Sequence, residues 1–152
     1  MRLIVLDAGP LGLIASPRGG PRAVQCWHWA MDLLAAGARV VVPEVADYEV
    51  RRKLLHLGSA HGVRRLDQLK AGLEYDPITT AVMLRAAELW AAARRAGLPT
   101  APPEALDADA ILAAQALQAA GPGGVATLAT TNVRHLGRFP GIDAREWETI
   151  AP

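Results

Sequence analysis

The stretch LIVLDAGPL, residues 3–11, decides the fold. Four aliphatic residues lead directly into Asp7, and a Gly-Pro pair follows at once. An apolar run this short and this continuous is typical of a central strand that is buried on both faces of a parallel sheet. We therefore predict a strand over residues 2–6 and a turn after it, with Asp7 at the carboxyl end of the strand.

The rest of the chain alternates between strand-like and helix-like segments. Short apolar or β-branched runs predict strands at 39–42, 73–78, 125–129 and 147–150. Helical spacing of apolar residues predicts helices at 21–36, 44–58, 61–71, 79–96 and 104–120. Such alternation favours an α/β protein with a parallel sheet and helices on both faces. Ligands of these sheets bind beyond the carboxyl ends of the strands, where Asp7 and Asn132 lie.

Three of the predicted helices have readable apolar faces. In the helix at 21–36 the apolar positions are Val24, Trp27, Met31 and Leu34. In the helix at 44–58 they are Val45, Tyr48, Leu54 and Leu55, and Asp47 is expected on a solvated face. In the helix at 79–96 they are Val82, Ala86, Leu89 and Ala93, with Thr79 or Thr80 as the cap. These faces are expected to pack on the sheet.

Bulk properties narrow the class of protein. A chain of 152 residues is expected to form one domain, residues 1–152. The formal net charge of +1 gives no global field that would attract nucleic acid. The single cysteine, Cys26, excludes an internal disulfide and a cysteine-based zinc site. No apolar run reaches the roughly 18 residues of a membrane span, and no signal peptide is visible. We therefore expect a cytoplasmic protein without a membrane partner.

The turn after Asp7 is poorly suited to holding a phosphate. Gly9 and Gly12 lack the spacing of a dinucleotide-binding loop. Pro10 also removes a backbone N–H that a phosphate cradle would use. Asp7 thus needs a different chemical explanation, and the other acids of the chain supply one.

Further acids follow other predicted strands. VVVPEVADYEVRRKL (40–54) holds Glu44, Asp47 and Glu49. EALDADAILAAQAL (104–117) holds Asp107 and Asp109, and ATLATTNVRHLGRF (126–139) holds Asn132. Carboxylates that converge from separate strand ends repel one another unless a cation lies among them. Oxygen ligands of this kind suit Mg²⁺ or Mn²⁺, and such cations can activate water and neutralise a phosphodiester.

These segments together resemble the PIN domain, a nuclease family that includes the VapC-like toxins of bacterial toxin–antitoxin pairs. Its apolar-run-Asp motif matches Asp7, and its Glu followed by Val-Arg-Arg matches Glu49 in YEVRRKL. Its D-A-x-[IL]-x-A-x-A-L helix matches Asp109 in DADAILAAQAL. Its T-x-[DN]-x-x-H-[FL] stretch matches Asn132 in TTNVRHL. The resemblance covers almost the whole chain.

The resemblance implies a three-layer α/β/α fold with a parallel sheet of about five strands. It also implies a metal-dependent endoribonuclease, with Asp7, Glu49, Asp109 and Asn132 as catalytic residues. Asp7, Glu49 and Asp109 would hold Mg²⁺ or Mn²⁺, and Asp107 is an additional candidate ligand. The implied partners are an RNA substrate, a small antitoxin protein and a second copy of the chain, for which the helix at 79–96 could provide the face.

Two departures affect the predicted site. Asn132 stands where an acid is common, and a neutral amide lowers the negative charge of the site. Asp107 precedes Asp109 by two residues, which on a regular helix separates the side chains by roughly 200°. Both can reach one metal ion only if Asp107 lies at or before the first residue of its helix.

Ordinary structural roles remain open for each candidate. Asp7 could form a turn, Glu49 could pair with Lys53, Asp109 could complement a helix dipole, and Asp107 could be an N-cap. Glu44 competes with Glu49 for the second position, and Thr130 and Thr131 could orient a ligand or a water molecule. The basic residues considered for contact with RNA are Arg51, Arg52, Arg134 and Arg138. The alternative function is a catalytically weak or inactive RNA-binding module with the same fold.

Overall fold

The structure is a computed structural model that describes residues 2–16, 19–97 and 103–152. Within these ranges the strands are β1 (Leu3–Leu6), β2 (Arg39–Pro43), β3 (Glu74–Asp76), β4 (Ala126–Thr130) and β5 (Ile142–Glu146). The helices are α1 (Ala8–Ala15), α2 (Pro21–Ala35), α3 (Glu44–His56), α4 (Ala60–Gly72), α5 (Thr80–Arg95), α6 (Pro103–Ala120) and α7 (Val133–Leu136), followed by the 3₁₀ helix η1 (Trp147–Thr149). None of the described helices is both long and apolar enough to cross a bilayer.

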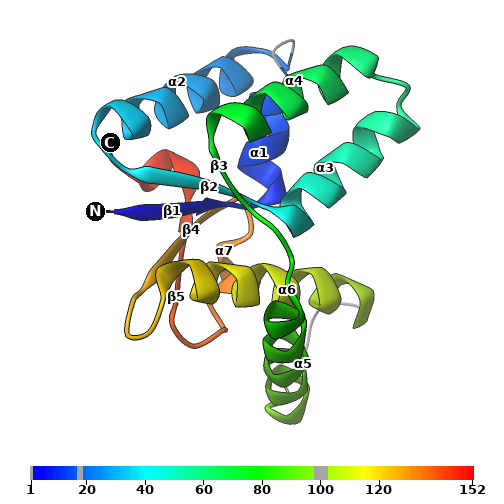
Figure 1. Ribbon diagram of the computed structural model, residues 1–152, viewed down its shortest axis with the longest axis vertical. Helices are drawn as coiled ribbons and strands as arrows, with labels where there is room; N and C mark the ends of the chain where they lie inside the picture. Colours follow the sequence, from blue (N-terminus) through cyan, green and yellow to red (C-terminus); the bar gives the residue numbers. More distant parts are fainter. Residues whose placement is uncertain (1, 17–18, 98–102) are drawn as a thin grey trace.

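The strands form one parallel sheet in the order β3-β2-β1-β4-β5, which confirms the predicted sheet (Figure 1). β1 lies at the centre, with Ile4 paired to Val40 of β2 and to Thr127 of β4. From β1 the chain first builds outward through β2 and β3, and then returns to add β4 on the other side of β1. The carboxyl ends of β1 and β4 therefore flank the point where the strand order reverses, which is the usual ligand position of such sheets.

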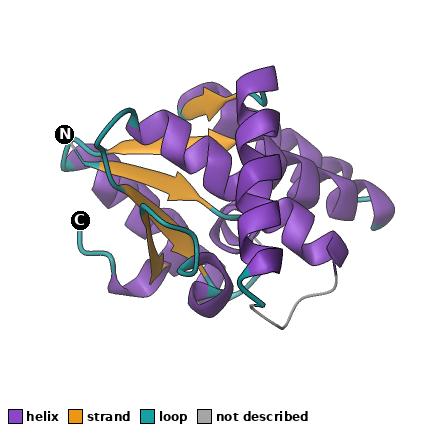
Figure 2. Cartoon of the chain, turned by 90° about the horizontal axis from the view of Figure 1, so that it is seen from below, coloured by secondary structure: helices purple, strands orange, loops and turns teal. Residues whose placement is uncertain are grey.

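The two faces of the sheet carry separate hydrophobic cores. Leu3 and Val5 of β1 pack with α5 and α6, whereas Ile4 and Leu6 pack with the helices α1 to α4. Figure 1 shows these helices on opposite sides of the strands, and Figure 2 shows the same chain from below. Because successive side chains of a strand point to opposite faces, the continuous apolar run of β1 fills both cores. The predicted three-layer α/β/α architecture is confirmed.

Helix α5 follows its predicted pattern closely. Its buried residues are Val82, Ala86, Leu89 and Ala93, which are the four predicted positions. Thr79 caps the helix, because its hydroxyl accepts the backbone N–H of Val82 at 3.2 Å. This face packs on α6 in the core that covers one side of the sheet.

The predicted turn after Asp7 is instead a helix, α1, which begins at Ala8 without any intervening loop. Pro10 is the third residue of this helix. The N–H groups of a first helical turn have no partner within the helix, so a proline is tolerated there. The Gly-Pro pair therefore marks the start of a helix, and Asp7 is its N-cap.

The apolar face predicted for α2 is only partly right: Trp27, Met31 and Leu34 are half-buried and pack against the core, but they do not form its buried stripe. The helix buries Ala23, Cys26, Trp29, Ala30 and Leu33, while Val24 is 47% exposed. The Sγ of Cys26 lies 3.6 Å from the carbonyl oxygen of Pro10 in α1. Close packing of α1 and α2 favours a stripe that contains small residues. Along the sequence, this stripe lies one residue before the bulkier apolar positions that were predicted.

The last strand lies earlier than predicted. β5 covers Ile142–Glu146 and pairs along its whole length with β4, whereas Trp147–Thr149 is the 3₁₀ helix η1. The apolar residues at 147–150 suggested a strand, but Trp147 is buried against Trp29, with their ring centroids 5.6 Å apart. β5 is an edge strand and tolerates the polar sequence IDARE.

Candidate active site

Asp7 lies at the carboxyl end of β1 and is fixed by two hydrogen bonds. Its Oδ1 accepts the backbone N–H of Ala8 at 2.7 Å, and its Oδ2 accepts the hydroxyl of Thr130 at 2.7 Å. The same Thr130 oxygen accepts the backbone N–H of Asn132 at 2.8 Å. Thr130 is fully buried at the end of β4. The loop after β4 therefore orients the carboxylate at the end of β1, across the point where the strand order reverses.

Glu49 and Asp109 extend from two other elements toward the same region. Burial raises the pKa of Asp7. Burial raises the pKa of Glu49 as well, and the charges of Asp7 and Asp109 raise it further. The pKa of Asp109 rises to about 6, because of burial first and the charge of Asp7 second. The charge of Asp7 thus acts on both Glu49 and Asp109, and the charge of Asp109 acts on Glu49.

Three carboxylates are oxygen donors of the kind that divalent cations prefer. Among the described residues, none of the three carboxylates forms an ion pair within 4 Å. In particular, Glu49 does not pair with Lys53. The carboxylates are not closed into a finished ligand cage, since no three acid, histidine or cysteine side chains of the described residues form one. Mutual repulsion opposes such closure until a cation compensates the charges.

Asp107 does not meet the condition for sharing a metal ion with Asp109. α6 begins at Pro103, so Asp107 lies inside the helix and is exposed. The two side chains project roughly 200° apart around the helix axis. Asp107 therefore cannot join Asp109 at one ion, and this part of the predicted ligand set is corrected.

Asn132 contributes to the site through its backbone. Its N–H bonds to Thr130, and its side chain is exposed, without a hydrogen bond among the described residues. Gly9 of α1 lies close to the same loop, because a Cβ at this position would come within 2.7 Å of the Thr131 Oγ1. The Asn132 amide thus lies at the surface beside Asp7 rather than in the buried part of the site.

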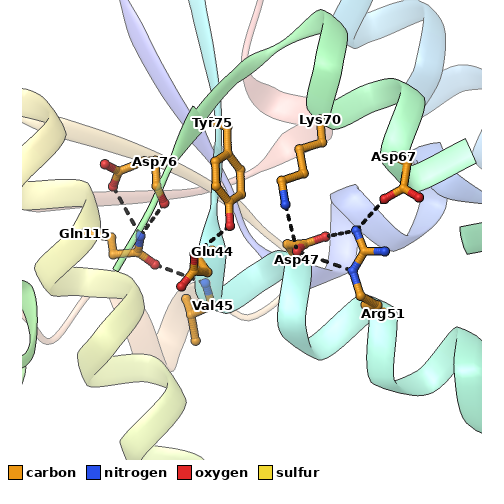
Figure 3. Close-up of polar contacts among 9 residues, drawn as sticks. All are labelled: Glu44, Val45, Asp47, Arg51, Asp67, Lys70, Tyr75, Asp76 and Gln115. Carbon is orange, nitrogen blue, oxygen red and sulfur yellow. Dashed lines mark hydrogen bonds and ion pairs between the residues drawn. The ribbon is translucent and has the colours of Figure 1, made fainter. Parts of the chain in front are cut away.

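The structure overturns the expectation for Asp47. This residue was expected on a solvated face of α3, but it is only 6% exposed. Its Oδ1 accepts Arg51 Nη2 at 2.8 Å, and its Oδ2 lies 3.8 Å from Lys70 Nζ (Figure 3). Arg51 also binds Asp67 at 2.8 Å. This network connects α3 to α4 and holds the Arg51 guanidinium that was considered for contact with RNA.

The other predicted basic residues lie at different depths. Arg52 and Arg134 are exposed, whereas Arg138 is partly buried and donates to the carbonyl oxygen of His135 at 2.8 Å. The charges of His135 and Arg138 lower the pKa of Asp109, which opposes the effects of burial and Asp7. The segment that contains α7 and Arg138 therefore brings positive charge near Asp109.

Gln115 is a supporting residue that the sequence analysis missed. It is completely buried in α6, its Oε1 accepts the N–H of Val45 at 3.1 Å, and its Nε2 donates to the carbonyl oxygen of Asp76 at 2.7 Å. Figure 3 shows it between β3 and the start of α3. It thus joins the helix that carries Asp109 to the helix that carries Glu49. The only signal in the sequence is a polar residue within an alanine-rich helix.

Two cavities meet at Glu49 and Arg52. The basic cavity, of about 930 Å³, lies between α1 and α3, and its lining includes Gly9, Gly12, Glu49, Arg52, Lys53 and His56. The aromatic cavity, of about 490 Å³, lies between α3 and α6, and its lining includes Glu44, Tyr48, Glu49, Arg52, Asp107 and Ile111. Glu44 also accepts the hydroxyl of Tyr75 at 2.6 Å. Glu49 and Arg52 therefore line both cavities. The first also holds Lys53 and His56 among mostly apolar residues, and the second holds Glu44 and Asp107 among mostly apolar residues.

Comparison with solved structures supports the fold over nearly the full length. VapBC2 from Rickettsia felis, bound to a DNA fragment from its promoter, matches with a TM-score of 0.70 and 17% identity over 95% of this chain and 98% of the other. VapBC-1 from nontypeable Haemophilus influenzae matches with a TM-score of 0.68 and 16% identity over 97% of this chain and 99% of the other. FitAcB from Neisseria gonorrhoeae matches with a TM-score of 0.66 and 18% identity, also over 97% of this chain and 99% of the other. At these identities the matches establish the fold alone.

A comparison with curated proteins gave no significant match. A comparison with models of protein families assigns the chain directly. Residues 27–135 match the PIN domain, and this range spans more than half of the chain. The match includes the segments that contain Glu49, Asp109 and Asn132. The chain therefore belongs to the PIN domain family.

Proposed function

We propose that this protein is an endoribonuclease that depends on Mg²⁺ or Mn²⁺. One observation carries the proposal: Asp7 after β1, Glu49 on α3 and Asp109 on α6 have no ion-pair partner within 4 Å among the described residues, although the charge of Asp7 raises the pKa of both other acids. PIN domains are generally nucleases. An unbalanced acidic group at the carboxyl ends of β1 and β4 lies where a sheet of this topology binds its ligand.

Asp7, Glu49 and Asp109 are the proposed ligands of the cation. Thr130 orients Asp7 through its hydroxyl, and Asn132 holds Thr130 in place through its backbone N–H. When bound, the cation would neutralise charge on the phosphodiester and lower the pKa of attacking water. The protein supplies the fixed oxygen donors and lowers the cost of gathering them by hydrogen-bonding Asp7 on both oxygens.

The basic cavity is the proposed path of the RNA backbone. Arg52, Lys53 and His56 line it on α3, directly beyond Glu49. Cationic side chains beside a divalent site attract a polyanion and position its phosphates by charge rather than by sequence. Arg138, whose charge lowers the pKa of Asp109, and Arg134 on α7 are proposed to contact phosphate on the other side of the site.

A toxin role within a toxin–antitoxin pair is a further proposal. The matched structures are complexes named VapBC and FitAcB. A small antitoxin that presents basic side chains would complement the three carboxylates. A homodimer is proposed through α5, because Met83 is 46% exposed and Leu84 is 65% exposed on this helix. RNA as the substrate is consistent with the expected cytoplasmic location.

The test is cleavage of RNA by purified protein with Mn²⁺. Asp7→Asn should reduce cleavage to background while the protein remains folded, because the amide cannot balance the cation's charge. Asp32→Asn, an exposed acid on α2, is the matched control and should cleave like the wild type. Equal cleavage by the Asp7 variant would exclude the proposed role of this carboxylate.

The exposed amide of Asn132 favours one second candidate, an RNA-binding module that does not cleave. In this case the wild type would bind RNA in the basic cavity but show no heat of Mn²⁺ binding at millimolar concentration. Cation binding together with cleavage would reject the module.

A further inference from the structure

The aromatic cavity has a property that cleavage alone does not require, namely a large exposed ring next to a candidate catalytic acid. Tyr48 lines this cavity and is 58% exposed, although the sequence pattern placed it on the apolar face of α3. It directly precedes Glu49 in the chain. The Arg52 guanidinium carbon lies 5.1 Å from the centroid of its ring. An exposed, planar side chain beside a cation is typical of surfaces on which bases of single-stranded nucleic acid stack.

The charges in the aromatic cavity argue against a phosphate there. Glu44 and Asp107 line it in addition to Glu49. One oxygen of Glu44 is already bound to the Tyr75 hydroxyl. Asp107 is exposed and has no hydrogen bond or ion pair among the described residues. Carboxylates repel phosphate but accept N–H groups, so this cavity suits a neutral group with hydrogen-bond donors.

The two cavities together suit one kind of polymeric ligand. The basic cavity suits an anionic backbone, and the aromatic cavity suits an uncharged, planar donor, with Glu49 and Arg52 at their junction. A cationic peptide would suit the second cavity but would be repelled from the first. A nucleotide presents both groups, a phosphate and a neutral base, on a single unit.

We propose that the aromatic cavity is a nucleobase subsite with a preference for guanine. The base stacks on Tyr48, and the carboxylate of Asp107 accepts the N1–H and N2–H groups of its Watson–Crick edge. Guanine alone among the four RNA bases presents two adjacent N–H donors, which match the two oxygens of a carboxylate. This inference rests on the proposed nuclease function and adds to it a substrate preference for unpaired, guanine-containing RNA.

The experiment measures binding to short RNA with the cleavage-deficient Asp7→Asn protein. The probes are labelled hexauridylate and three hexamers with one central guanine, adenine or cytosine, followed by fluorescence anisotropy at about 50 mM salt. We expect the guanine hexamer to bind roughly tenfold more tightly than hexauridylate. Adding Tyr48→Ala should weaken binding of the guanine hexamer by about tenfold or more, and Tyr48→Phe should restore it.

Two further variants separate recognition from general effects. Asp107→Asn should remove the discrimination between guanine and uracil, and Asp32→Asn should retain it. Tyr48 is exposed, so its variants are expected to unfold at the wild-type temperature. Equal binding of all four hexamers, or no effect of Tyr48→Ala, would overturn the subsite. Tighter binding of a tetra-arginine peptide than of the guanine hexamer, with the same dependence on Tyr48, would overturn it in favour of a cationic peptide.

Cleavage by the wild-type protein distinguishes failure of the nucleobase subsite from failure of the proposed nuclease function. If the wild type cleaves RNA with Mn²⁺ but without dependence on Tyr48 or on guanine, the subsite is wrong and the nuclease stands. If the wild type neither cleaves nor binds RNA, both are wrong.

Discussion

Asp47 and Glu49 lie two residues apart on α3, yet their surroundings are opposite. Asp47 is nearly buried and contacts the cationic groups of Arg51 and Lys70. Glu49 is partly buried and has no ion pair among the described residues. The charges of Asp7 and Asp109 raise its pKa, and that of Arg52 lowers it without an ion pair. Residues at this spacing point to different sides of a helix. One side of α3 therefore carries a compensated charge that joins it to α4, and the other side carries an uncompensated charge at the candidate site.

This contrast separates acids that stabilise the fold from acids that await a ligand. A compensated acid should be costly to remove and have little effect on cation binding. Removing an uncompensated acid should leave the free energy of unfolding of the cation-free protein unchanged or raise it. The same substitution should abolish activity. Substitutions on the two sides of α3 test both statements.

The largest expected effect follows from Glu49→Gln. Cleavage should fall by a factor on the order of 10² or more, because a charged donor is lost at the reacting phosphate. The free energy of unfolding of the cation-free protein at pH 7 should stay equal or rise, because the charge that burial and the neighbouring acids disfavour is gone. Initial cleavage rates measure the loss of activity, and urea denaturation in EDTA measures the free energy of unfolding. A stability loss comparable to that of Asp47→Asn would contradict the contrast.

The next effect concerns the other side of the helix. Asp47→Asn should lower the free energy of unfolding by about 2–3 kcal/mol, because a nearly buried carboxylate loses its bonds to two cations. Asp67→Asn removes a partner of the same Arg51, but Asp67 is largely exposed, so this change should cost less than about 1 kcal/mol. Urea denaturation compares the two variants. Equal costs would show that burial does not strengthen the Asp47 contacts.

A smaller effect is expected at Gln115. Gln115→Met keeps the side-chain length but leaves the Val45 N–H and the Asp76 carbonyl oxygen without their partner. The free energy of unfolding should fall by about 1–2 kcal/mol. Thermal and urea denaturation would show this change. No loss of stability would mean that water replaces these bonds and that α3 and α6 do not depend on Gln115.

A last effect is a dependence of stability on pH, which appears as a change with pH rather than as a loss on substitution. The pKa of Asp109 is 3.8 in an ordinary environment and about 6 in the folded chain. Between these values the folded state holds more protons than the unfolded state, so the stability of the cation-free protein falls as the pH rises. Asp109→Asn lacks this contribution. The melting temperature of the wild type in EDTA should therefore decline relative to that of the variant from about pH 4 to pH 6.

A melting-temperature difference that stays constant with pH would contradict this assignment. Comparison with the variant is essential, because other acids act in the opposite direction. Arg39, for example, lowers the pKa of Glu74, so the contribution of Glu74 to stability increases with pH. The difference between wild type and Asp109→Asn removes such common contributions.

The sequence was sufficient for the parts of the fold that depend on local pattern. The continuous run at 3–6 predicted the central strand, and the spacing in α5 predicted its buried face. The positions of Asp7, Glu49 and Asp109 relative to the strands and helices predicted which acids the fold would bring near one another. Their roles as ligands stay predictions until a cation is measured.

Features that depend on distant partners were not predictable in this way. Asp47 was expected in solvent, because Lys70, one of the cations beside it, comes from another helix. Tyr48 was expected in the core, because helical spacing alone does not reveal that a cavity lies beside it. In both cases the deciding neighbour lies outside the local pattern.

The most direct test of the contrast is calorimetric titration of Mn²⁺ into the wild type, Glu49→Gln and Asp47→Asn proteins. We expect the wild type to bind the cation, Glu49→Gln to bind it at least about tenfold more weakly, and folded Asp47→Asn to bind it like the wild type. No binding by the wild type at millimolar Mn²⁺, or unchanged binding by Glu49→Gln, would contradict the claim that the uncompensated acids form a cation site.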